Sequence, residues 1–196
     1  MRPFVSGLVL AAGASTRLGQ PKQLLPFGST TLLGHVLSQV RAAALDEVVV
    51  VIGAAAAEVR RRIDFVGVKL VENPDFGEGC SSSYRTGIGA LDPRAEAVAI
   101  LLGDQPGVEY AVIDTVIEAW RRRPKEIALV SYRGRCGHPM VFARTLFQQL
   151  AALRGDKAAW KIVDTHPHWL HPVPIDRPCP GDVNTWQEYE ALLSGQ

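Results

Sequence analysis

The hydrophobic pattern divides the chain into short apolar runs and longer stretches with a helical period. Four runs are rich in Val, Ile and Leu, namely residues 7–12, 47–52, 97–102 and 126–132. Polar and apolar positions do not alternate regularly within them, as they would in a strand with one face in water. Each run therefore predicts a strand that is covered on both faces, as in a parallel sheet.

Two stretches between these runs have the spacing of amphipathic helices. The apolar positions are Leu32, Leu33, Val36, Leu37 and Val40 in the first stretch, and Val112, Ile113, Val116, Ile117 and Trp120 in the second. Each set forms one apolar stripe along a helix. Strands that alternate with helices build βαβ units, whose right-handed crossovers cover both faces of a sheet. The pattern predicts a doubly wound α/β fold with a mostly parallel sheet and helices on both faces.

The last third of the chain is less regular. We expect a turn at 134–139, a short strand at 140–143, a helix around 147–153 and a turn at 154–157. Proline and histidine crowd residues 165–182, which predicts a loop around one extended segment, before a final helix near 185–193. The sequence contains no internal repeat and no stretch typical of a linker. At 196 residues the chain is expected to form one domain.

Composition argues against large charged partners. The chain has 21 Lys and Arg against 20 Asp and Glu, a net charge of +1, so we expect neither nucleic acid nor a membrane as a partner. Arginine runs at 60–62 and 121–123 fall at or near the ends of predicted helices, where cations favour the helix dipole, and we expect them to be solvated.

Cysteine usage and the start of the chain predict the compartment. Cys80, Cys136 and Cys179 form no CxxC pair, which favours reduced thiols. The first residues imitate a short signal peptide, but its removal would delete the first strand, and no run is apolar for long enough to cross a membrane. We expect a cytoplasmic protein.

The turn after the first strand is the first candidate site, because ligands of doubly wound folds bind beyond the carboxyl ends of strands. Small residues, 11–15, let backbone N–H groups approach an anion, and Arg17 and Lys22 follow. This combination suits a polyphosphate, although neither GxxxxGK[ST] nor GxGxxG is present. The structural alternative is a glycine turn with two solvated cations.

Two aspartates extend this candidate site. Asp104 comes directly off an apolar run, where it either binds Mg²⁺ or forms an Asx turn or helix cap. Asp182 either caps the final helix, with Thr185 as a rival cap, or is a second metal ligand. A small-residue turn, an arginine, a lysine and two aspartates make up the set that metal-assisted phosphoryl chemistry requires.

A serine-rich segment is a further candidate. Asn73, Ser81, Ser82 and Ser83 lie in a loop that leads into a predicted helix. The N-terminal amides of that helix could meet a base or a phosphate. The alternative is a serine-capped helix start without a ligand.

Five segments together resemble one family. Residues 8–28, "LVLAAGASTRLGQPKQLLPFG", resemble the signature LAAGxSxRMGxxKxLLPxG of MobA-like nucleotidyltransferases, especially the molybdenum cofactor cytidylyltransferase branch. The resemblance continues through "LLGDQP" (101–106), "GHPMVF" (137–142), "RGDK" (154–157) and "DVNTWQEY" (182–189). The order and approximate spacing of these segments cover nearly the whole chain.

This resemblance implies a single-domain, Rossmann-like nucleotidyltransferase fold over 1–196, with a nucleotide-binding half of about 1–107 and an acceptor-binding half of about 108–196. With the residue-level interpretation above, the predicted catalytic residues are Lys22, Arg17 and Asp104, and the predicted Mg²⁺ ligands are Asp104 and Asp182. The predicted nucleotide-binding residues are Leu10, Ala11, Ala12, Gly13, Ser15, Arg17, Lys22, Asn73, Ser81, Ser82 and Gly103, and the acceptor-binding residues are Gly137, His138 and Asp156.

The resemblance also implies the substrates. The branch that uses CTP has LAAG where the GTP-using branch has LAGG, so Ala12 favours CTP. The implied reaction is Mg²⁺-dependent transfer of a cytidylyl group from CTP to the phosphate of molybdopterin-type cofactor, with release of pyrophosphate. A molybdoenzyme that receives the cofactor is a further expected partner.

Some positions depart from the family pattern. Leu18 replaces a methionine of similar volume, and Asn184 replaces the second acid of a D-V-D motif. Ala158 and Trp160 differ from R-G-D-K-G-A-R, which affects acceptor recognition. The alternatives are another phosphorylated acceptor, such as a sugar or alditol phosphate, an NAD(P)-dependent oxidoreductase, or a maturation partner of a molybdoenzyme.

Overall fold

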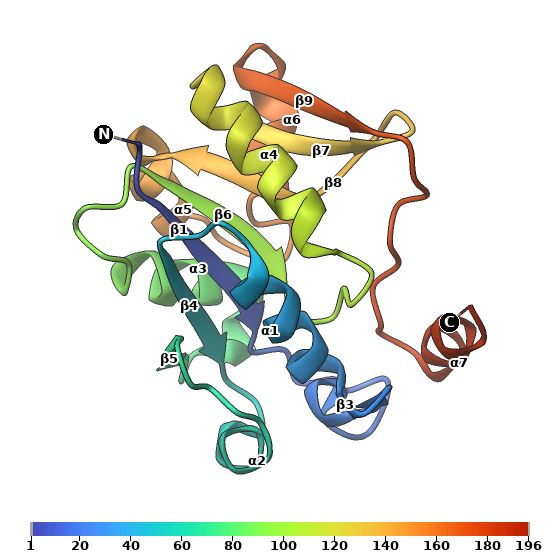
Figure 1. The fold of residues 1–196 in the computed structure, drawn as a ribbon. Helices are drawn as coiled ribbons and strands as arrows, with labels where there is room; N and C mark the ends of the chain where they lie inside the picture. Colours follow the sequence, from blue (N-terminus) through green and yellow to red (C-terminus); the bar gives the residue numbers. More distant parts are fainter. Residues whose placement is uncertain (1, 196) are drawn as a thin grey trace.

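The computed structural model describes residues 2–195 and contains a seven-stranded sheet with the order β5-β4-β1-β6-β8-β7-β9 (Figure 1). The strands are β1 (Val5–Ala11), β4 (Glu47–Ile52), β5 (Lys69–Glu72), β6 (Ala97–Leu102), β7 (Ile127–Tyr132), β8 (Arg135–Ala143) and β9 (Leu170–Ile175). A small second sheet pairs β2 (Pro26–Phe27) with β3 (Thr30–Thr31). Each of the four predicted strands is present in the large sheet.

Helices cover both faces of the large sheet. The first face packs against α1 (Leu32–Ala42), α2 (Ala56–Arg62) and α4 (Tyr110–Arg122), and the second against α3 (Cys80–Gly89), α5 (Phe147–Ala151) and α6 (Trp160–Thr165). Single-turn 3₁₀ helices are η1 (Lys22–Leu24), η2 (Phe76–Glu78), η3 (Arg144–Leu146) and η4 (Pro167–Trp169). Two separate apolar clusters result, one on each side of the sheet. The predicted doubly wound, single-domain α/β fold is confirmed.

The sheet is mostly parallel, with one reversed strand. Strand β8 runs antiparallel to both β6 and β7, whereas the other neighbours are parallel. The expected turn over 134–139 is wrong, because the chain reverses at Arg133 and Gly134, with φ of 46° and 87°, and β8 begins at Arg135. Pro139 stays within the strand beside a register shift between Leu129 and Val130, where a missing N–H is tolerated.

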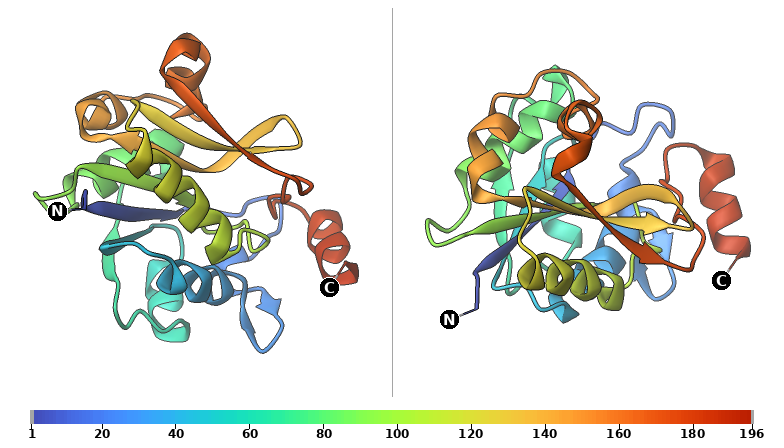
Figure 2. Two further views of the ribbon diagram at one scale, coloured as in Figure 1. Left: turned by 45° about the horizontal axis from the view of Figure 1, so that its top comes forward. Right: turned by 90° about the horizontal axis from the view of Figure 1, so that it is seen from above.

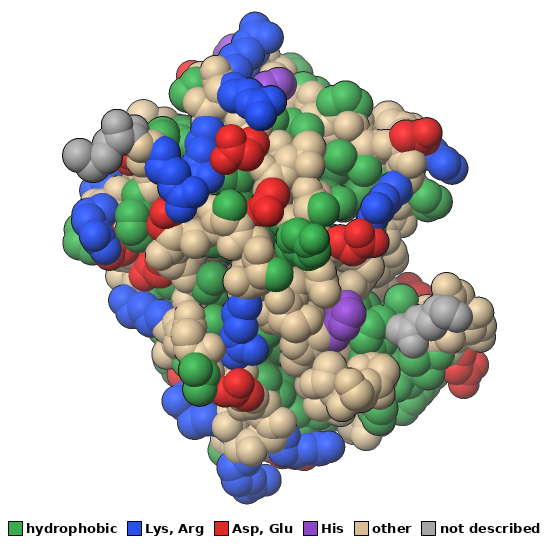
Figure 3. Space-filling view, viewed as in Figure 1, with side chains coloured by type: hydrophobic (Ala, Val, Ile, Leu, Met, Phe, Trp, Pro, Cys, Tyr) green, Lys and Arg blue, Asp and Glu red, His purple; other side chains and the backbone are tan. Residues whose placement is uncertain are grey.

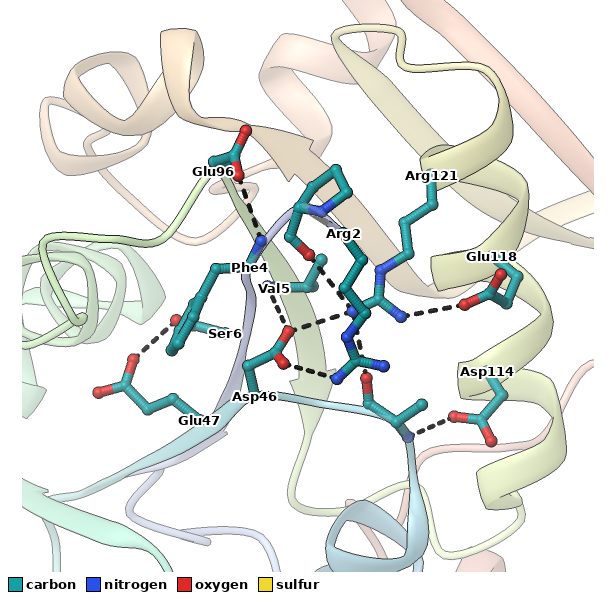
Figure 4. Close-up of polar contacts among 12 residues, drawn as sticks. Arg2, Phe4, Val5, Ser6, Asp46, Glu47, Glu96, Asp114, Glu118 and Arg121 are labelled. Atoms are coloured by element: carbon teal, nitrogen blue, oxygen red, sulfur yellow. Dashed lines mark hydrogen bonds and ion pairs between the residues drawn. The ribbon is translucent and has the colours of Figure 1, made fainter.

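One arginine run does not behave as expected. Arg121 is not solvated, since its side chain is only 6% exposed and forms ion pairs with Asp46 at 3.1 Å and Glu118 at 3.0 Å. Asp46 also accepts a hydrogen bond from the backbone N–H of Val5 at 2.9 Å (Figure 4). Arg121 therefore links α4 to the amino ends of β1 and β4. The other two residues of the run, Arg122 and Arg123, are exposed.

The C-terminal helix α7 (Trp186–Ser194) packs near the β2–β3 hairpin rather than on the large sheet (Figure 2). The hydroxyl of Tyr189 donates a hydrogen bond to the carbonyl of Pro26 at 2.5 Å. Thr185 caps the helix, because its side chain accepts from the N–H of Glu188 while the Glu188 carboxylate accepts from the Thr185 N–H. Of the two capping candidates, Thr185 is the cap, and Asp182 has no capping role.

The surface carries no large field of one sign on the face seen in Figure 3, where basic and acidic side chains are interspersed. Within residues 2–195, no helix combines the length and the apolar composition needed to cross a membrane.

Candidate active site

A cavity opens where the strand order reverses. Strand β1 pairs with β4 on one side and with β6 on the other, and the cavity lies beyond the carboxyl ends of β1 and β6, at the topological switch point. Its volume is about 560 Å³. We call it the β1–β6 cavity. It is lined by Leu10, Ala11, Ala12, Gly13, Arg17, Lys22, Gln23, Phe76, Gly79, Cys80, Ser83, Leu102, Gly103, Asp104, Asp156, Asp182 and Asn184.

The turn after β1 is held open by local hydrogen bonds. Ser15, with φ of 55°, accepts a hydrogen bond from the N–H of Lys22 through its Oγ at 3.1 Å. Gln23 is 2% exposed, and its Nε2 donates to the carbonyls of Ala11 at 2.7 Å and Gly13 at 3.1 Å. These contacts fix the backbone of the small-residue turn from behind and direct the Lys22 side chain into the cavity.

Gly103 lets the two central strands approach each other at the floor of this cavity. A Cβ at Gly103 would lie 2.8 Å from the Cβ of Ala11 and 3.1 Å from the carbonyl oxygen of Leu10. Any larger residue would push β6 away from β1. This close approach places the residue after Gly103, Asp104, beside the turn that carries Lys22.

Three polar side chains meet at the centre of the cavity. The Lys22 ammonium forms an ion pair with a carboxylate oxygen of Asp104 and donates a hydrogen bond to Oδ1 of Asn184 at 2.9 Å. The side chains of Lys22 and Asp104 are only 15% and 17% exposed. Asp104 caps no helix, since α4 begins six residues later after Glu109. The aspartate therefore serves the cavity rather than a helix end.

The loop before α7 closes the same region. The N–H of Val183 donates to the carbonyl of Asp104 at 3.1 Å, and Nε2 of Gln105 donates to a carboxylate oxygen of Asp182. Burial raises the pKa of Asp182, and the nearby charge of Asp104 raises it further, whereas the Gln105 hydrogen bond and the Lys22 charge lower it. Two aspartates from distant parts of the chain thus face one cavity.

These oxygens are of the kind that hold Mg²⁺ or Mn²⁺. Both ions prefer carboxylate, carbonyl and phosphate oxygens, and Mg²⁺ usually takes only one or two carboxylates from the protein. One ammonium contacts both Asp104 and Asn184, so a single cation can reach both oxygens. Residues 2–195 contain no cluster of three or more His, Cys, Asp or Glu side chains that would bind a metal unaided. The donor set fits a metal that shares its coordination with substrate phosphates.

The start of α3 forms another wall of the cavity. Asn73 is 1% exposed, and its Nδ2 donates to the hydroxyls of Ser82 at 2.8 Å and Ser83 at 3.1 Å. Asn73, Ser81 and Ser82 are buried and do not line the cavity, whereas Ser83 does. The amide and the serines fix the first turn of α3 from within.

Asp156 sits at the amino end of α3. The backbone N–H of Cys80 points at its carboxylate, with an N–O distance of 3.4 Å. Gly79 makes room for this approach, because its φ is 94° and a Cβ there would lie 2.6 Å from Oδ1 of Asp156. Asp156 thus lines the β1–β6 cavity rather than the cavity that contains Gly137 and His138.

Cys80 does not provide a nucleophile in the β1–β6 cavity. Burial raises the pKa of its thiol to about 11, and the charges of Asp104 and Asp156 raise it further. At neutral pH the side chain is a protonated thiol, which is a poor nucleophile.

A second cavity of about 320 Å³ adjoins the first and shares Leu102 and Asp182 with it. We call it the β8 cavity. It is lined by Leu102, Gln105, Arg135, Cys136, Gly137, His138, Trp160, Cys179, Pro180, Gly181 and Asp182. His138 lies edge-on to Trp160, with ring centroids 6.0 Å apart. Gly137 and His138, two of the predicted acceptor-binding residues, therefore meet next to the predicted metal ligands.

Two side chains that line the β8 cavity each have a buried polar atom without a partner among residues 2–195. Within residues 2–195, Nε2 of His138 and Oε1 of Gln105 form no hydrogen bond, although both side chains are only 7% exposed. Burial lowers the pKa of His138 to about 4, so the imidazole is neutral at physiological pH. The β8 cavity is therefore lined by two neutral side chains, His138 and Gln105, as well as by the charged Arg135 and Asp182.

The structure brings together most of the predicted site. Ten residues of the predicted site line the β1–β6 cavity: Leu10, Ala11, Ala12, Gly13, Arg17, Lys22, Gly103, Asp104, Asp156 and Asp182. Ser15 shapes the turn without lining it. Sequence reasoning missed Gln23, Phe76, Gly79 and Gln105 as site residues. Gln23 had one usable signal, since it is a polar residue between the predicted lysine and an apolar stretch.

Comparisons with known proteins identify the family of this chain. A family model described as MobA-like NTP transferase domain matches residues 7–170. The crystal structure of Rv0371C in complex with manganese, from Mycobacterium tuberculosis H37Rv, superimposes with a TM-score of 0.88 at 37% identity, covering 98% of this chain and 100% of that one.

Two curated relatives carry names of different enzyme classes. Nicotine blue oxidoreductase of Paenarthrobacter nicotinovorans is 32% identical over 176 residues, which cover 86% of this chain and 85% of that protein. Molybdenum cofactor cytidylyltransferase of Escherichia coli (strain K12) is 25% identical over 143 residues, which cover 72% and 71% of the two chains. With the family model covering most of its length, the chain belongs to the MobA-like NTP transferase family and is an enzyme of the nucleotidyltransferase kind.

Proposed function

We propose that this enzyme transfers a cytidylyl group from CTP to the phosphate of a molybdopterin-type cofactor, with Mg²⁺ as the metal and pyrophosphate as the second product. The observation that carries the proposal is the β1–β6 cavity, in which the small-residue turn, Arg17, Lys22 and two aspartates face one volume. Metal-assisted phosphoryl chemistry needs this combination of cations and metal-binding oxygens.

The nucleotide half of the site follows from the turn after β1. Ala11 to Gly13 line the cavity with little side-chain bulk, so backbone groups can lie close to a nucleotide. Ala12 stands where the GTP-using branch has glycine, which supports CTP. Arg17 and Lys22 would neutralise charge on the α-phosphate and on the departing pyrophosphate. The nucleotide-binding half at about 1–107 is part of this proposal.

The chemistry needs little acid or base assistance. The terminal phosphate of the acceptor is already ionised and would attack the α-phosphate in line, forming one P–O bond while the bond to pyrophosphate breaks. Asp104 and Asp182 would hold the metal, which supplies charge neutralisation on the phosphates when it is bound. Asn184 adds a neutral oxygen beside Asp104.

The acceptor would extend into the β8 cavity, which adjoins the proposed metal ligands through Asp182. Gly137 and His138 line it, and they belong to the acceptor-binding half that we propose at about 108–196. A sugar or alditol phosphate would place its own phosphate in the same position, so the nature of the acceptor has to come from product identification. We also propose a cytoplasmic location, which the three free thiols support.

A second candidate function is that of an NAD(P)-dependent oxidoreductase, which the 32% identity to nicotine blue oxidoreductase favours. The absence of GxGxxG counts against a dinucleotide in the β1–β6 cavity. Lys22 and Asp104 count against a maturation partner without catalytic activity, since such a partner has no need of them.

The experiment that tests the proposal is product analysis. The protein is incubated with CTP and Mg²⁺ and, in separate reactions, with molybdopterin, a sugar phosphate and an alditol phosphate. We expect pyrophosphate and a cytidylylated pterin only with molybdopterin, and less product when GTP replaces CTP. Pyrophosphate formed only with a sugar or alditol phosphate would overturn the acceptor, and turnover of NADPH without any pyrophosphate would favour the oxidoreductase.

A further inference from the structure

The centre of the β1–β6 cavity contains a cation of the protein's own. The Lys22 ammonium contacts one oxygen of Asp104, a proposed metal ligand, and the neutral oxygen of Asn184 beside it. We propose that Lys22 occupies the metal position in the ligand-free protein, so that metal and triphosphate bind together rather than independently. This inference rests on the proposed function.

The ammonium and the metal compete for the same oxygens. Asp104 is the only carboxylate within ion-pair distance of Lys22 among residues 2–195, and it is only 17% exposed. A divalent cation beside this oxygen would be repelled by an ammonium at the same place, and the partial burial of the two side chains strengthens that repulsion. The metal therefore gains full access to Asp104 only when Lys22 moves.

The structure allows this movement without a change of the backbone. Lys22 is the first residue of η1, and its N–H is fixed by the Ser15 hydroxyl, while its carbonyl accepts from the N–H of Leu25 at 3.2 Å. Only the flexible side chain has to swing. Arg17 lines the same cavity, so phosphates held there would offer Lys22 new anionic partners within its reach.

Asn184 contributes only a neutral partner to Lys22. Its side chain is an amide, which accepts a hydrogen bond at 2.9 Å but adds no negative charge. Asp182 is engaged by Gln105, so one carboxylate alone forms the ion pair with the lysine. Phosphates therefore compete with a single charge when they draw Lys22 away.

Coupling of this kind is reciprocal. If triphosphate binding frees Asp104 for the metal, then the metal must raise the affinity for triphosphate by the same factor, typically about 5- to 150-fold. A side chain that merely neutralises phosphate would give a different result, because its removal would weaken triphosphate binding without affecting metal affinity in the absence of nucleotide.

The test is the affinity of the full-length protein for Mn²⁺ in the absence of nucleotide, measured by the electron paramagnetic resonance signal of free Mn²⁺. We expect Lys22→Met to bind Mn²⁺ at least about tenfold more tightly than the wild type, within the usual range for such coupling. Lys22→Gln should change the affinity in the same direction and serves if the methionine variant does not fold. The matched control is Lys69→Met, because Lys69 donates to the carbonyl of Ala90 on the surface and should leave Mn²⁺ affinity unchanged.

Adding Asp104→Asn to Lys22→Met should abolish the gain. Equal Mn²⁺ affinity in the wild type and both Lys22 variants would overturn the inference, as would a gain that survives the loss of Asp104. CTP binding, measured in parallel by calorimetry, separates the two proposals. If CTP binds and the Lys22 variants show no increase in Mn²⁺ affinity, only this inference fails. If Mn²⁺ affinity increases but CTP does not bind, the proposed function is contradicted, while the competition between Lys22 and the metal is supported.

Discussion

The two adjoining cavities satisfy their polar groups in opposite ways. In the β1–β6 cavity, Lys22 is paired with Asp104 and Asn184, and Asp182 is paired with Gln105. In the β8 cavity, the imidazole of His138 is neutral and has an unpaired nitrogen among residues 2–195. The first cavity therefore contains paired charges that a charged ligand must rearrange, whereas the second combines the neutral His138 and Gln105 with the charged Arg135 and Asp182.

This difference matches the two halves of the proposed reaction. A triphosphate and a metal are highly charged and need mobile counter-charges, whereas the body of the acceptor needs shape and hydrogen bonds. Asp182, one of the two residues that line both cavities, lies at the boundary, where the acceptor phosphate would meet the nucleotide.

The largest expected effect is a loss of activity when a charge is removed from the β1–β6 cavity. Asp104→Asn keeps an oxygen for Lys22 but removes the charge that would hold the metal, so we expect transfer activity to fall by at least about 100-fold with little loss of stability. Pyrophosphate release measures the activity. Asp176→Asn is the control, because that carboxylate is 91% exposed. Activity equal to that of the control would show that Asp104 has no catalytic role.

The next effect is a loss of stability when Gln23, which holds the turn after β1, is changed. In Gln23→Glu a carboxylate would face the carbonyls of Ala11 and Gly13, to which Gln23 now donates. We expect the free energy of unfolding to fall by about 3 kcal/mol or more, since the new carboxylate would be buried without a hydrogen-bond donor beside it. Urea unfolding measures the change, and Gln23→Met, which removes the hydrogen bonds without adding charge, should lose less. Equal losses in both variants would show that charge repulsion is not involved.

A smaller effect is expected where Asp156 meets α3. Gly79→Ala should destabilise the protein by about 1–3 kcal/mol, because alanine is strained at a φ of 94° and its Cβ would displace the Asp156 carboxylate. Gly77→Ala is the matched control, since a Cβ there meets nothing within 4 Å. If both variants melt at the same temperature, the Asp156 contact does not constrain the wall of the cavity.

The last effect appears only in acid and probes the β8 cavity. The pKa of His138 is about 4 in the folded protein and near 6.5 in the unfolded chain, so only the unfolded chain takes up this proton between those pH values. Stability should therefore fall as the pH is lowered from 6.5 to 4, by up to about 1.4 kcal/mol per pH unit. Above pH 6.5 the histidine contributes no pH dependence. Urea unfolding at pH 5 and 7 should show a smaller difference for His138→Gln than for the wild type, and equal differences would mean that His138 is charged in the fold.

That several candidate residues would lie around one cavity, the β1–β6 cavity, was predictable because they follow strands directly. The apolar runs locate β1 and β6, and the rule that ligands bind at the ends of parallel strands then joins the turn at 11–15 to Asp104. The partners that hold these residues were not predictable. Gln23 and Gln105 act through contacts with backbone and side chains whose positions depend on the folded chain.

The β8 region was predicted less well for a physical reason. A reversed strand breaks the alternation of strands and helices. Two glycines and a proline give residues 134–139 the composition of a turn, although β8 starts at Arg135. Arg121 was misjudged for a related reason, because helix periodicity alone does not show that Asp46 lies opposite. Elements that depend on distant partners are the ones that local patterns miss.

The most direct test of the central claim is thermal unfolding of the protein with CTP, GTP, ATP and NADPH, each with and without Mg²⁺, alongside Lys22→Ala. A ligand at 100 times its dissociation constant adds about 2.7 kcal/mol, roughly 5 to 10 °C for a domain of this size. We predict that CTP with Mg²⁺ stabilises the wild type selectively and that Lys22→Ala loses the effect. Stabilisation by NADPH and by no triphosphate would contradict the account.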